Sequence, residues 1–330
     1  MTGLGGAIAE TIVHEHGQAE FIRRISDPFF FQALGCVLAF DWHSSGLTTT
    51  TLGALKVALT RNELGIKVCG GKGKVSRKTP SEIEFNSEKL SLSSQKSESL
   101  VYASRMSAKV DSALVQDNYN LYAHFFVFSE NGCYAVVQQG MNPKIGYARR
   151  YHWLSGFENF IEEPHSAICC DKKESEVLDL TSKKSSETRS ISVDLVKDNP
   201  EHLERDFNRV LNMTSNHYNL NLSRKSLTYL KKAYEFQPKN YEELIAIHGV
   251  GPSSVRALAL ISELVYGTKS SWCDPSKFSF AHGGKDGVPF NVKRKVMDSN
   301  TEFLKDAVKN AKMGDKDRLN AIRRLKDFIR

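Results

Sequence analysis

Residues 240–267 read NYEELIAIHGVGPSSVRALALISELVYG, and this stretch defines the expected fold of the second half of the chain. Leu244 and Ile245 place apolar side chains on one face of a short helix, which the run His-Gly-Val-Gly at 248–251 interrupts. Pro252 then stands in the first turn of a second helix, where its missing N–H costs nothing. Beyond it, apolar residues recur at helical spacing. The stretch therefore predicts two short helices joined by a Gly-x-Gly turn.

Two helices joined in this way resemble the helix-hairpin-helix family of DNA-binding modules, here with the bounds 241–267. The resemblance implies that N–H groups at the start of the second helix face a phosphate, which glycines allow to approach the backbone. Such a contact reads no bases, so binding should depend on salt and not on DNA sequence. The expected contacts are Gly249, Gly251, Ser253, Ser254 and Arg256. The alternative is an αα-hairpin with a glycine turn and no ligand.

The composition is that of a globular chain with a polyanionic partner. Its 330 residues allow two domains, or one large domain with an appendage, and 40% hydrophobic residues can form a core. The net charge of +7 comes from 45 basic and 38 acidic residues that are interspersed. Six cysteines without a CxxC pair indicate reduced thiols, and no apolar run reaches the ~18 residues of a membrane helix. We expect a cytoplasmic protein with no membrane partner, and the composition is compatible with a homo-oligomer.

The order of segments predicts an α+β (or α/β) domain over residues 1–170, a polar connector over 171–197 and an all-helical domain over 198–330. Tyr122–Phe128 and Cys133–Gln139 flank a turn that contains Asn-Gly, the strongest short signal for a β-hairpin. The connector could be an exposed helix or a partly disordered segment. A further strand is expected at 66–69, and helices at 4–25, 48–59, 100–115, 200–213, 222–235 and 298–330.

Two basic runs are candidates for contact with nucleic acid. Gly-Gly-Lys-Gly-Lys at 70–74 combines backbone N–H groups with cations, as an anion-binding loop does, although the spacing is not that of a P-loop. The alternative is a flexible basic surface loop. Tyr-Ala-Arg-Arg-Tyr-His-Trp at 147–153 mixes guanidinium groups with rings, a mixture suited to phosphates and bases. Its arginines could instead pair with acids, and its rings could be core. The predicted contacts are Lys72, Lys74, Arg77, Arg149, Arg150 and His152.

Acidic and histidine side chains are the candidates for catalysis. The apolar run Phe29–Phe40 must be buried, and it leads into Asp-Trp-His-Ser-Ser-Gly at 41–46. Ionisable groups at the end of a rigid element suit an active site, but Asp41 could instead cap the helix that follows. Glu162–His165 adds two carboxylates and an imidazole. The predicted catalytic residues are Asp41, His43, Asp111, Asp117, Glu163 and His165, and the predicted ligands of Mg²⁺ or Mn²⁺ are Asp41, His43, Asp111, Asp117 and Glu163.

Two functions from different classes fit these groups. The first is a metal-dependent DNA nuclease, in which carboxylates hold the metal and cations stabilise the developing charge. No acid spacing specifies such a site, and the D…ExK pattern of common nuclease folds is not evident. The second is a DNA-binding protein without enzymatic activity, in which the same groups form a track for single- or double-stranded DNA. Nucleotide binding by the glycine-rich basic loop is a weaker third interpretation.

Five stretches resemble one family and together extend over nearly the whole chain. They are 23–56 (RRISDPFFFQALGCVLAFDWHSSGLTTTTLGALK), 70–80 (GGKGKVSRKTP), 102–128 (YASRMSAKVDSALVQDNYNLYAHFFVF), 135–155 (AVVQQGMNPKIGYARRYHWLS) and 274–290 (DPSKFSFAHGGKDGVPF). The chain resembles the archaeal and bacterial family catalogued as domain of unknown function 763. Members of that family usually carry an additional N-terminal stretch with a Leu-Pro-Leu-His-Gly-Gly-like run, which is not evident in this sequence. The resemblance implies nucleic-acid processing mainly through the helix-hairpin-helix.

Overall fold

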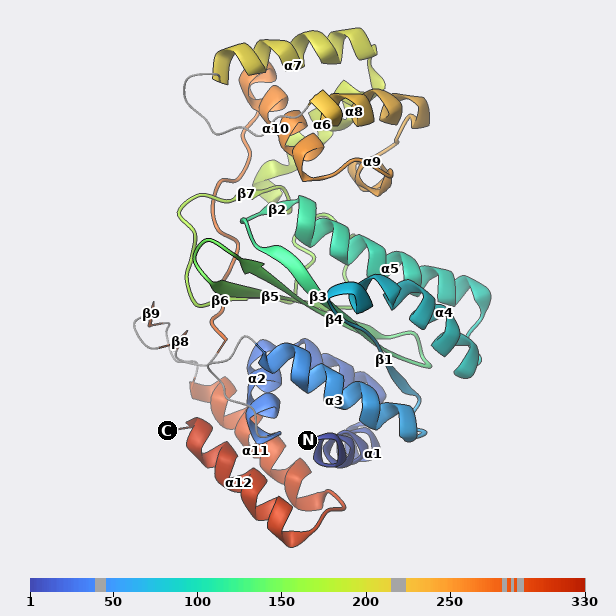
Figure 1. Ribbon diagram of the computed structural model, residues 1–330, viewed down its shortest axis with the longest axis vertical. Helices are drawn as coiled ribbons and strands as arrows, with labels where there is room; N and C mark the ends of the chain where they lie inside the picture. Colours follow the sequence, from blue (N-terminus) through green and yellow to red (C-terminus); the bar gives the residue numbers. More distant parts are fainter. Residues whose placement is uncertain (39–45, 215–223, 281–283, 286–287, 290–293, 330) are drawn as a thin grey trace.

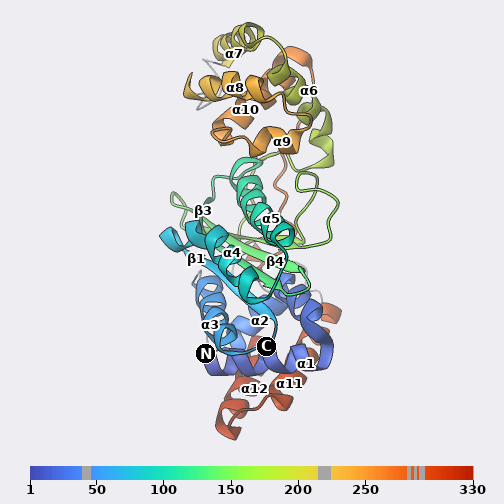
Figure 2. The same ribbon diagram turned by 90° about the vertical axis from the view of Figure 1, so that its right-hand side faces the viewer.

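The computed structural model describes residues 1–38, 46–214, 224–280, 284–285, 288–289 and 294–329. Over these residues the fold is mixed α+β, with helices on both faces of a five-stranded antiparallel sheet (Figures 1 and 2). The predicted α+β class is confirmed at this level. Asp41 and His43 lie outside the described residues.

The sheet has the strand order β1-β3-β4-β5-β6, with every neighbouring pair antiparallel. The predicted hairpin is present, because β3 and β4 pair from Phe128 with Tyr134 onwards and the Asn-Gly turn lies between them. The predicted strand at 66–69 is also present and extends to Lys72. The strands are β1 Ile66–Lys72, β3 Asn120–Ser129, β4 Tyr134–Asn142, β5 Tyr147–Leu154 and β6 Ala167–Cys170.

Three N-terminal helices cover one face of the sheet: α1 Thr2–Ser26, α2 Pro28–Val37 and α3 Leu47–Arg61. Asp27 ends α1 and caps α2, because its Oδ1 accepts hydrogen bonds from the N–H groups of Phe29 and Phe30 at 2.8 and 2.9 Å. Every residue of α2 is buried, as its apolar sequence predicts. Phe31 of this helix belongs to a core that also includes Val127 and Val137 of the strands.

The opposite face carries α4 Thr79–Lys89 and α5 Ser94–Ala113, which follow the short 3₁₀ helix η1 Gly73–Lys78. Helix α5 lies across the middle strands and buries Met106 and Val110 against side chains that include Phe126 and Trp153. Its Ser104, Ser107 and Asp111 are also buried. This helix therefore presents polar as well as apolar groups to the interior of the protein.

A cluster of helices stands at one end of the molecule, beyond α5 (Figure 1). Its apolar residues belong to the same continuous core as those of α5, so the cluster has no separate core. The stretch predicted as a polar connector contributes to it, because Val193 and Val196 of α6 are buried and α6 packs against α10. The elements are β2 Val115–Gln116, β7 Leu178–Asp179, η2 Lys183–Ser185, α6 Ser186–Lys197, α7 Pro200–Thr214, α8 Arg224–Phe236, α9 Tyr241–Ala246 and α10 Pro252–Tyr266.

The last two helices, α11 Arg294–Asn310 and α12 Asp315–Ile329, lie at the other end of the molecule. They pack against α1 and α2, and Leu304 and Leu325 belong to the core of those helices. The predicted all-helical segment 198–330 is thus divided between the two ends, and its single helix at 298–330 is two helices. The periodicity of an amphipathic helix shows that one face is buried, but not which part of the protein covers that face. The sequence could therefore not show this division.

An extended segment, 268–280, joins the two ends and runs beside β7 and β6 (Figure 1). The Asp179 N–H donates to the carbonyl of Ser271 at 2.8 Å, and the Cys170 N–H donates to that of Phe278 at 3.1 Å. The segment thus brings Asp274 and Lys277 next to β6. Two short strands, β8 Gly284–Lys285 and β9 Val288–Pro289, follow it.

Candidate functional site

Strand β5 carries alternating side chains to two polar clusters, one on each face of the sheet. It lies between β4 and β6, so both of its edges are paired. Arg149, Tyr151 and Trp153 point to the α5 side, while Arg150 and His152 point to the α2 side, as strand alternation requires. All five side chains are buried.

Arg149 forms a buried double ion pair. Its Nη1 donates to Asp117 Oδ2 at 3.0 Å and its Nη2 donates to Asp274 Oδ2 at 2.6 Å. Burial raises the pKa of Asp117 to about 6, although Arg149 and the hydroxyl of Tyr151 act in the opposite direction. Burial also acts on Asp274, but there Arg149 and Ser276 prevail and the pKa is lowered. Both carboxylates are therefore ionised at neutral pH, and pairing with acids, the alternative to a phosphate contact, is what the structure shows for Arg149.

Arg150 is equally inaccessible. It is 1% exposed, its Nη1 donates to Gln32 Oε1 at 3.0 Å, and its Nε donates to His152 Nε2 at 2.7 Å. Burial and the adjacent guanidinium hold the pKa of His152 well below its usual range, so this ring is a neutral acceptor. Neither Arg150 nor His152 can reach a phosphate from these positions, which corrects their predicted role. The high density of arginine and aromatic residues in this run did not show whether it lies on the surface or in the interior.

Asp111 and His165, two predicted catalytic residues, are in direct contact although 54 residues separate them. His165 Nε2 lies 2.5 Å from Asp111 Oδ1, within hydrogen-bond distance. Gln138 Nε2 and Trp153 Nε1 donate to Asp111 Oδ2 at 2.5 and 3.1 Å. Burial raises the pKa of Asp111, although His165 and Trp153 act in the opposite direction. A carboxylate that holds one imidazole nitrogen leaves the other one, Nδ1, available for proton transfer.

The hydrogen bonds continue from Asp111 along the buried face of α5. Gln138 Oε1 meets His124 Nδ1 at 2.8 Å, and His124 Nε2 meets Ser104 Oγ at 2.9 Å. Because Gln138 uses its amide N–H on Asp111, its carbonyl must accept from His124 Nδ1–H, and Ser104 must donate to Nε2. A continuous line of hydrogen bonds therefore joins Ser104 to His165 through His124, Gln138 and Asp111, and we call it the buried relay.

We expect His124 to stay neutral in acid. Burial lowers its pKa from 6.5 to about 4, with a small opposing effect of Gln138. In the unfolded chain, His124 takes up a proton near pH 6.5. Its burial should therefore lower the free energy of unfolding by up to about 3 kcal/mol as the pH falls from 6.5 to 4. NMR titration of the ring should give the midpoint, and unfolding at pH 7 and 4.5 should show a smaller loss for His124→Gln. The variant comparison is needed because the raised pKa values of Asp111, Asp117 and Asp179 act in the opposite sense. A midpoint near 6.5 would contradict the buried relay.

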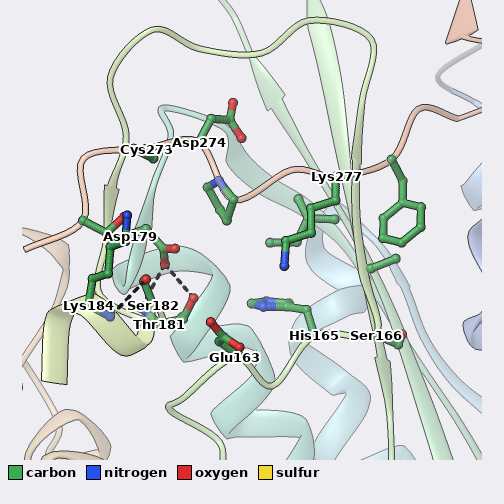
Figure 3. Close-up of a pocket in the computed structure, with 15 residues that line it drawn as sticks. Glu163, His165, Ser166, Asp179, Thr181, Ser182, Lys184, Cys273, Asp274 and Lys277 are labelled. Atoms are coloured by element: carbon green, nitrogen blue, oxygen red, sulfur yellow. Dashed lines mark hydrogen bonds between the residues drawn. The ribbon is translucent and has the colours of Figure 1, made fainter. Parts of the chain in front are cut away.

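His165 opens into a cavity of about 500 Å³ between the loop before β6 and the segment 268–280. Figure 3 shows His165 and Lys277 pointing into it from one side, with Asp179 and Lys184 on the opposite side. Glu163 also lines the cavity and has φ +46°, a left-handed conformation that costs a non-glycine residue ~1 kcal/mol or more. Two cations, an imidazole and several carboxylates make this a mixed-charge site suited to acid–base chemistry.

The predicted metal ligands do not converge in the part of the chain that the structure describes. Asp111 has both oxygens bonded in the interior, Asp117 lies in the Arg149 cluster, and Glu163 is exposed in the cavity. No group of three or more His, Cys, Asp or Glu side chains among the described residues could hold a metal ion. Because Asp41 and His43 are outside those residues, Mg²⁺ or Mn²⁺ binding stays a prediction.

The glycine-rich run at 70–74 forms the end of β1 and the start of η1, and not a loop that encloses an anion. Gly70 has φ +95°, and a Cβ there would lie 2.1 Å from the His124 carbonyl oxygen, so this glycine serves the pairing of β1 with β3. Its amide donates to Glu82 Oε2 at 2.7 Å. The cations of this stretch are exposed on the surface, and they include Lys72, Lys74 and Arg77. The alternative of a basic surface thus describes this run better.

A second pocket, of about 390 Å³, lies beside these cations and α5, and we call it the basic pocket. Arg77, Arg105 and Lys109 line it, and Ser104 and His124 of the buried relay form part of its wall. No acidic residue lines it in the described part of the chain. Arg105 and Lys109 were not predicted as site residues. They occur singly in a helix, and only their spacing of four residues places them on one face.

Only one of the two glycines in the turn between α9 and α10 has a conformation that favours glycine. Gly249 has φ +94°, and a Cβ there would lie 2.2 Å from the Tyr229 ring. Gly251, by contrast, has open space around its Cβ position and begins α10 without a side-chain cap. Ser253 and Arg256 line a pocket of about 320 Å³ with residues of the α5–β3 connection, whereas Ser254 is buried. The predicted side-chain role of Ser254 is therefore unsupported.

The sequence matches a family model described as a protein of unknown function (DUF763) over residues 1–292. The chain belongs to this family. The match includes the α9–α10 stretch, and only α11 and α12 lie beyond it. No curated protein and no solved structure matches the chain. Within the described residues, no helix has the length and apolar character that crossing a membrane requires.

Proposed function

We propose that this protein binds the phosphate backbone of nucleic acid along α5. The observation that supports the proposal most directly is the position of Ser112. This residue lines both the basic pocket and the pocket at the start of α10. The two pockets are therefore neighbours along the same helix, and a strand that follows α5 would meet both.

The charges along this path are available to an anion. None of the cations from the end of β1, from η1 and from the middle of α5 forms an ion pair with a described residue, while many other basic residues of the chain do. A basic surface attracts polyanions and releases their counterions on binding. The cations are Lys72, Lys74, Arg77, Lys78, Arg105 and Lys109.

The α9–α10 turn supports the same proposal as a helix-hairpin-helix. Gly251 stands at the N-cap of α10 with nothing but the Gly249 carbonyl near its Cβ position, at 4.0 Å. The first N–H groups of the helix can then meet a phosphate oxygen without steric obstruction. The turn also faces the pocket that adjoins the basic pocket. The α9–α10 turn and the cations at 72–77 were both predicted from sequence as phosphate contacts, and the neighbouring pockets support a common path.

Gly251→Val tests this contact without disturbing the fold. Gly251 has φ −117° and ψ −171°, a conformation open to any residue, so its replacement should leave the melting temperature within a few degrees. The side chain would occupy the phosphate position and should flatten the dependence of DNA affinity on salt by about one unit of slope. Gly249→Ala is the matched control, because its methyl group would meet Tyr229 and destabilise the protein. DNA binding by Gly251→Val with the wild-type salt slope would show that the hairpin is only structural.

The predicted metal-dependent cleavage has less support than binding. Its acids are dispersed among the described residues, although the Asp111–His165 pair suits proton transfer. Incubation of labelled DNA with Mg²⁺ or Mn²⁺, with and without chelator, separates a nuclease from a binding protein. The binding proposal holds in either case.

A further inference from the structure

The basic pocket has an apolar wall as well as a charged rim. Pro80, Leu121 and Tyr122 line it together with the three cations Arg77, Arg105 and Lys109. A simple phosphate contact needs only the charges. A volume of about 390 Å³ with apolar sides also suits a small organic group attached to the phosphate.

Lys109 indicates that an anion belongs in this pocket. Its side chain is half-buried, and burial lowers its pKa. No carboxylate of the described residues pairs with it, so its ammonium group has lost water without gaining a counter-charge. An anionic ligand would supply that charge and remove the cost.

The buried end of the pocket is polar and rigid. Ser104 is 2% exposed and donates its hydroxyl hydrogen to His124, which leaves the lone pairs of Ser104 Oγ able to accept from a ligand N–H. The other relay groups, His124 and Gln138, hold this hydroxyl in place. The pocket thus combines a charged rim, an apolar wall and a polar end.

We propose that the basic pocket holds one unstacked nucleotide, with its phosphate on Arg105 and Lys109 and its base against the apolar wall. This inference rests on the proposed function, because the nucleotide is taken to be part of a nucleic-acid strand bound along α5. A free mononucleotide has the same chemistry and could occupy the same site. Bases in a duplex are stacked and paired, so they cannot enter without an unpairing cost. The pocket therefore makes single strands the preferred ligand.

Two variants separate the pocket from its charges. Ala108 lines the pocket between the two α5 cations, and Ala108→Phe should fill the volume while it keeps all three charges. Arg105→Ala combined with Lys109→Ala removes two charges and keeps the volume. The probes are thymidine monophosphate, an oligothymidylate strand and its duplex with oligoadenylate. Melting temperatures confirm that each variant is folded.

The wild type should bind the single strand more tightly than the duplex. Ala108→Phe should weaken binding of the single strand and of thymidine monophosphate by about tenfold or more, the value of one stacked base, and leave duplex binding unchanged. The charge variant should weaken the single strand and the duplex alike.

The outcomes distinguish the pocket from the phosphate track. Equal affinity for both polynucleotides, unaltered by Ala108→Phe, would overturn the nucleotide pocket and leave backbone binding intact. Binding of thymidine monophosphate alone, abolished in Ala108→Phe, would support the pocket and overturn the proposed function. Absence of binding to all three probes would overturn both.

Discussion

Arg149→Met should lower the free energy of unfolding by about 3 to 5 kcal/mol, the cost of breaking a buried ion pair from one side. The side chain is fully buried and holds the carboxylates of Asp117 and Asp274. Methionine fills a similar volume, so the loss comes from two unpaired buried charges and not from a cavity. Chemical denaturation at pH 8 measures it. Adding Asp117→Asn should recover part of the stability, because it removes one of the two orphaned charges.

The pH dependence of the same variant gives an independent check. Without Arg149, the pKa of Asp117 rises further above that of the unfolded chain, so the orphaned carboxylate is neutralised as the pH falls. The difference between wild type and variant should therefore be smaller at pH 5 than at pH 8. The exposed Arg77→Ala is the control and should change stability by no more than ~0.5 kcal/mol. Wild-type stability together with abolished DNA affinity in Arg149→Met would instead restore the phosphate contact first expected for this residue.

Removal of three cations, Arg77→Ala with Arg105→Ala and Lys109→Ala, should weaken DNA binding at ~0.1 M salt by roughly tenfold for each phosphate that the variant no longer neutralises. The slope of log affinity against log salt should flatten by about two to three units, depending on strand type. Titration of labelled DNA at several salt concentrations measures both quantities. Because these side chains line a surface pocket and form no ion pair with described residues, the melting temperature should change little.

A second triple variant controls for net charge. Lys305, Lys312 and Lys316 are exposed on α11, α12 and their connection, at the opposite end of the molecule from α9 and α10. Their replacement by alanine changes the charge of the protein by the same amount. An equal decrease of affinity in both triple variants would show that overall charge, and no track along α5, attracts the DNA.

Local patterns in the sequence predicted most of the elements of this fold. The Asn-Gly turn between two apolar runs predicted the β3–β4 hairpin, and the apolar run after Asp27 predicted a buried helix with its cap. Gly249 and Pro252 predicted where α9 ends and α10 begins. In each case the cause lies within a few neighbouring residues: a left-handed glycine, a proline without an N–H, or side chains that repeat on one face.

The partners of the charged side chains were decided only by the tertiary structure. Arg149 and Asp274 are 125 residues apart, and the pair exists because β5 is an interior strand beside which the segment 268–280 passes. Likewise, Asp111 meets His165, and Arg77 meets Lys109 in one pocket, because α5 packs across the middle strands of the sheet. The identity of a basic residue does not show whether it lies on the surface or in the interior. Its environment depends on which strands and helices cover it, and that is a property of long-range packing.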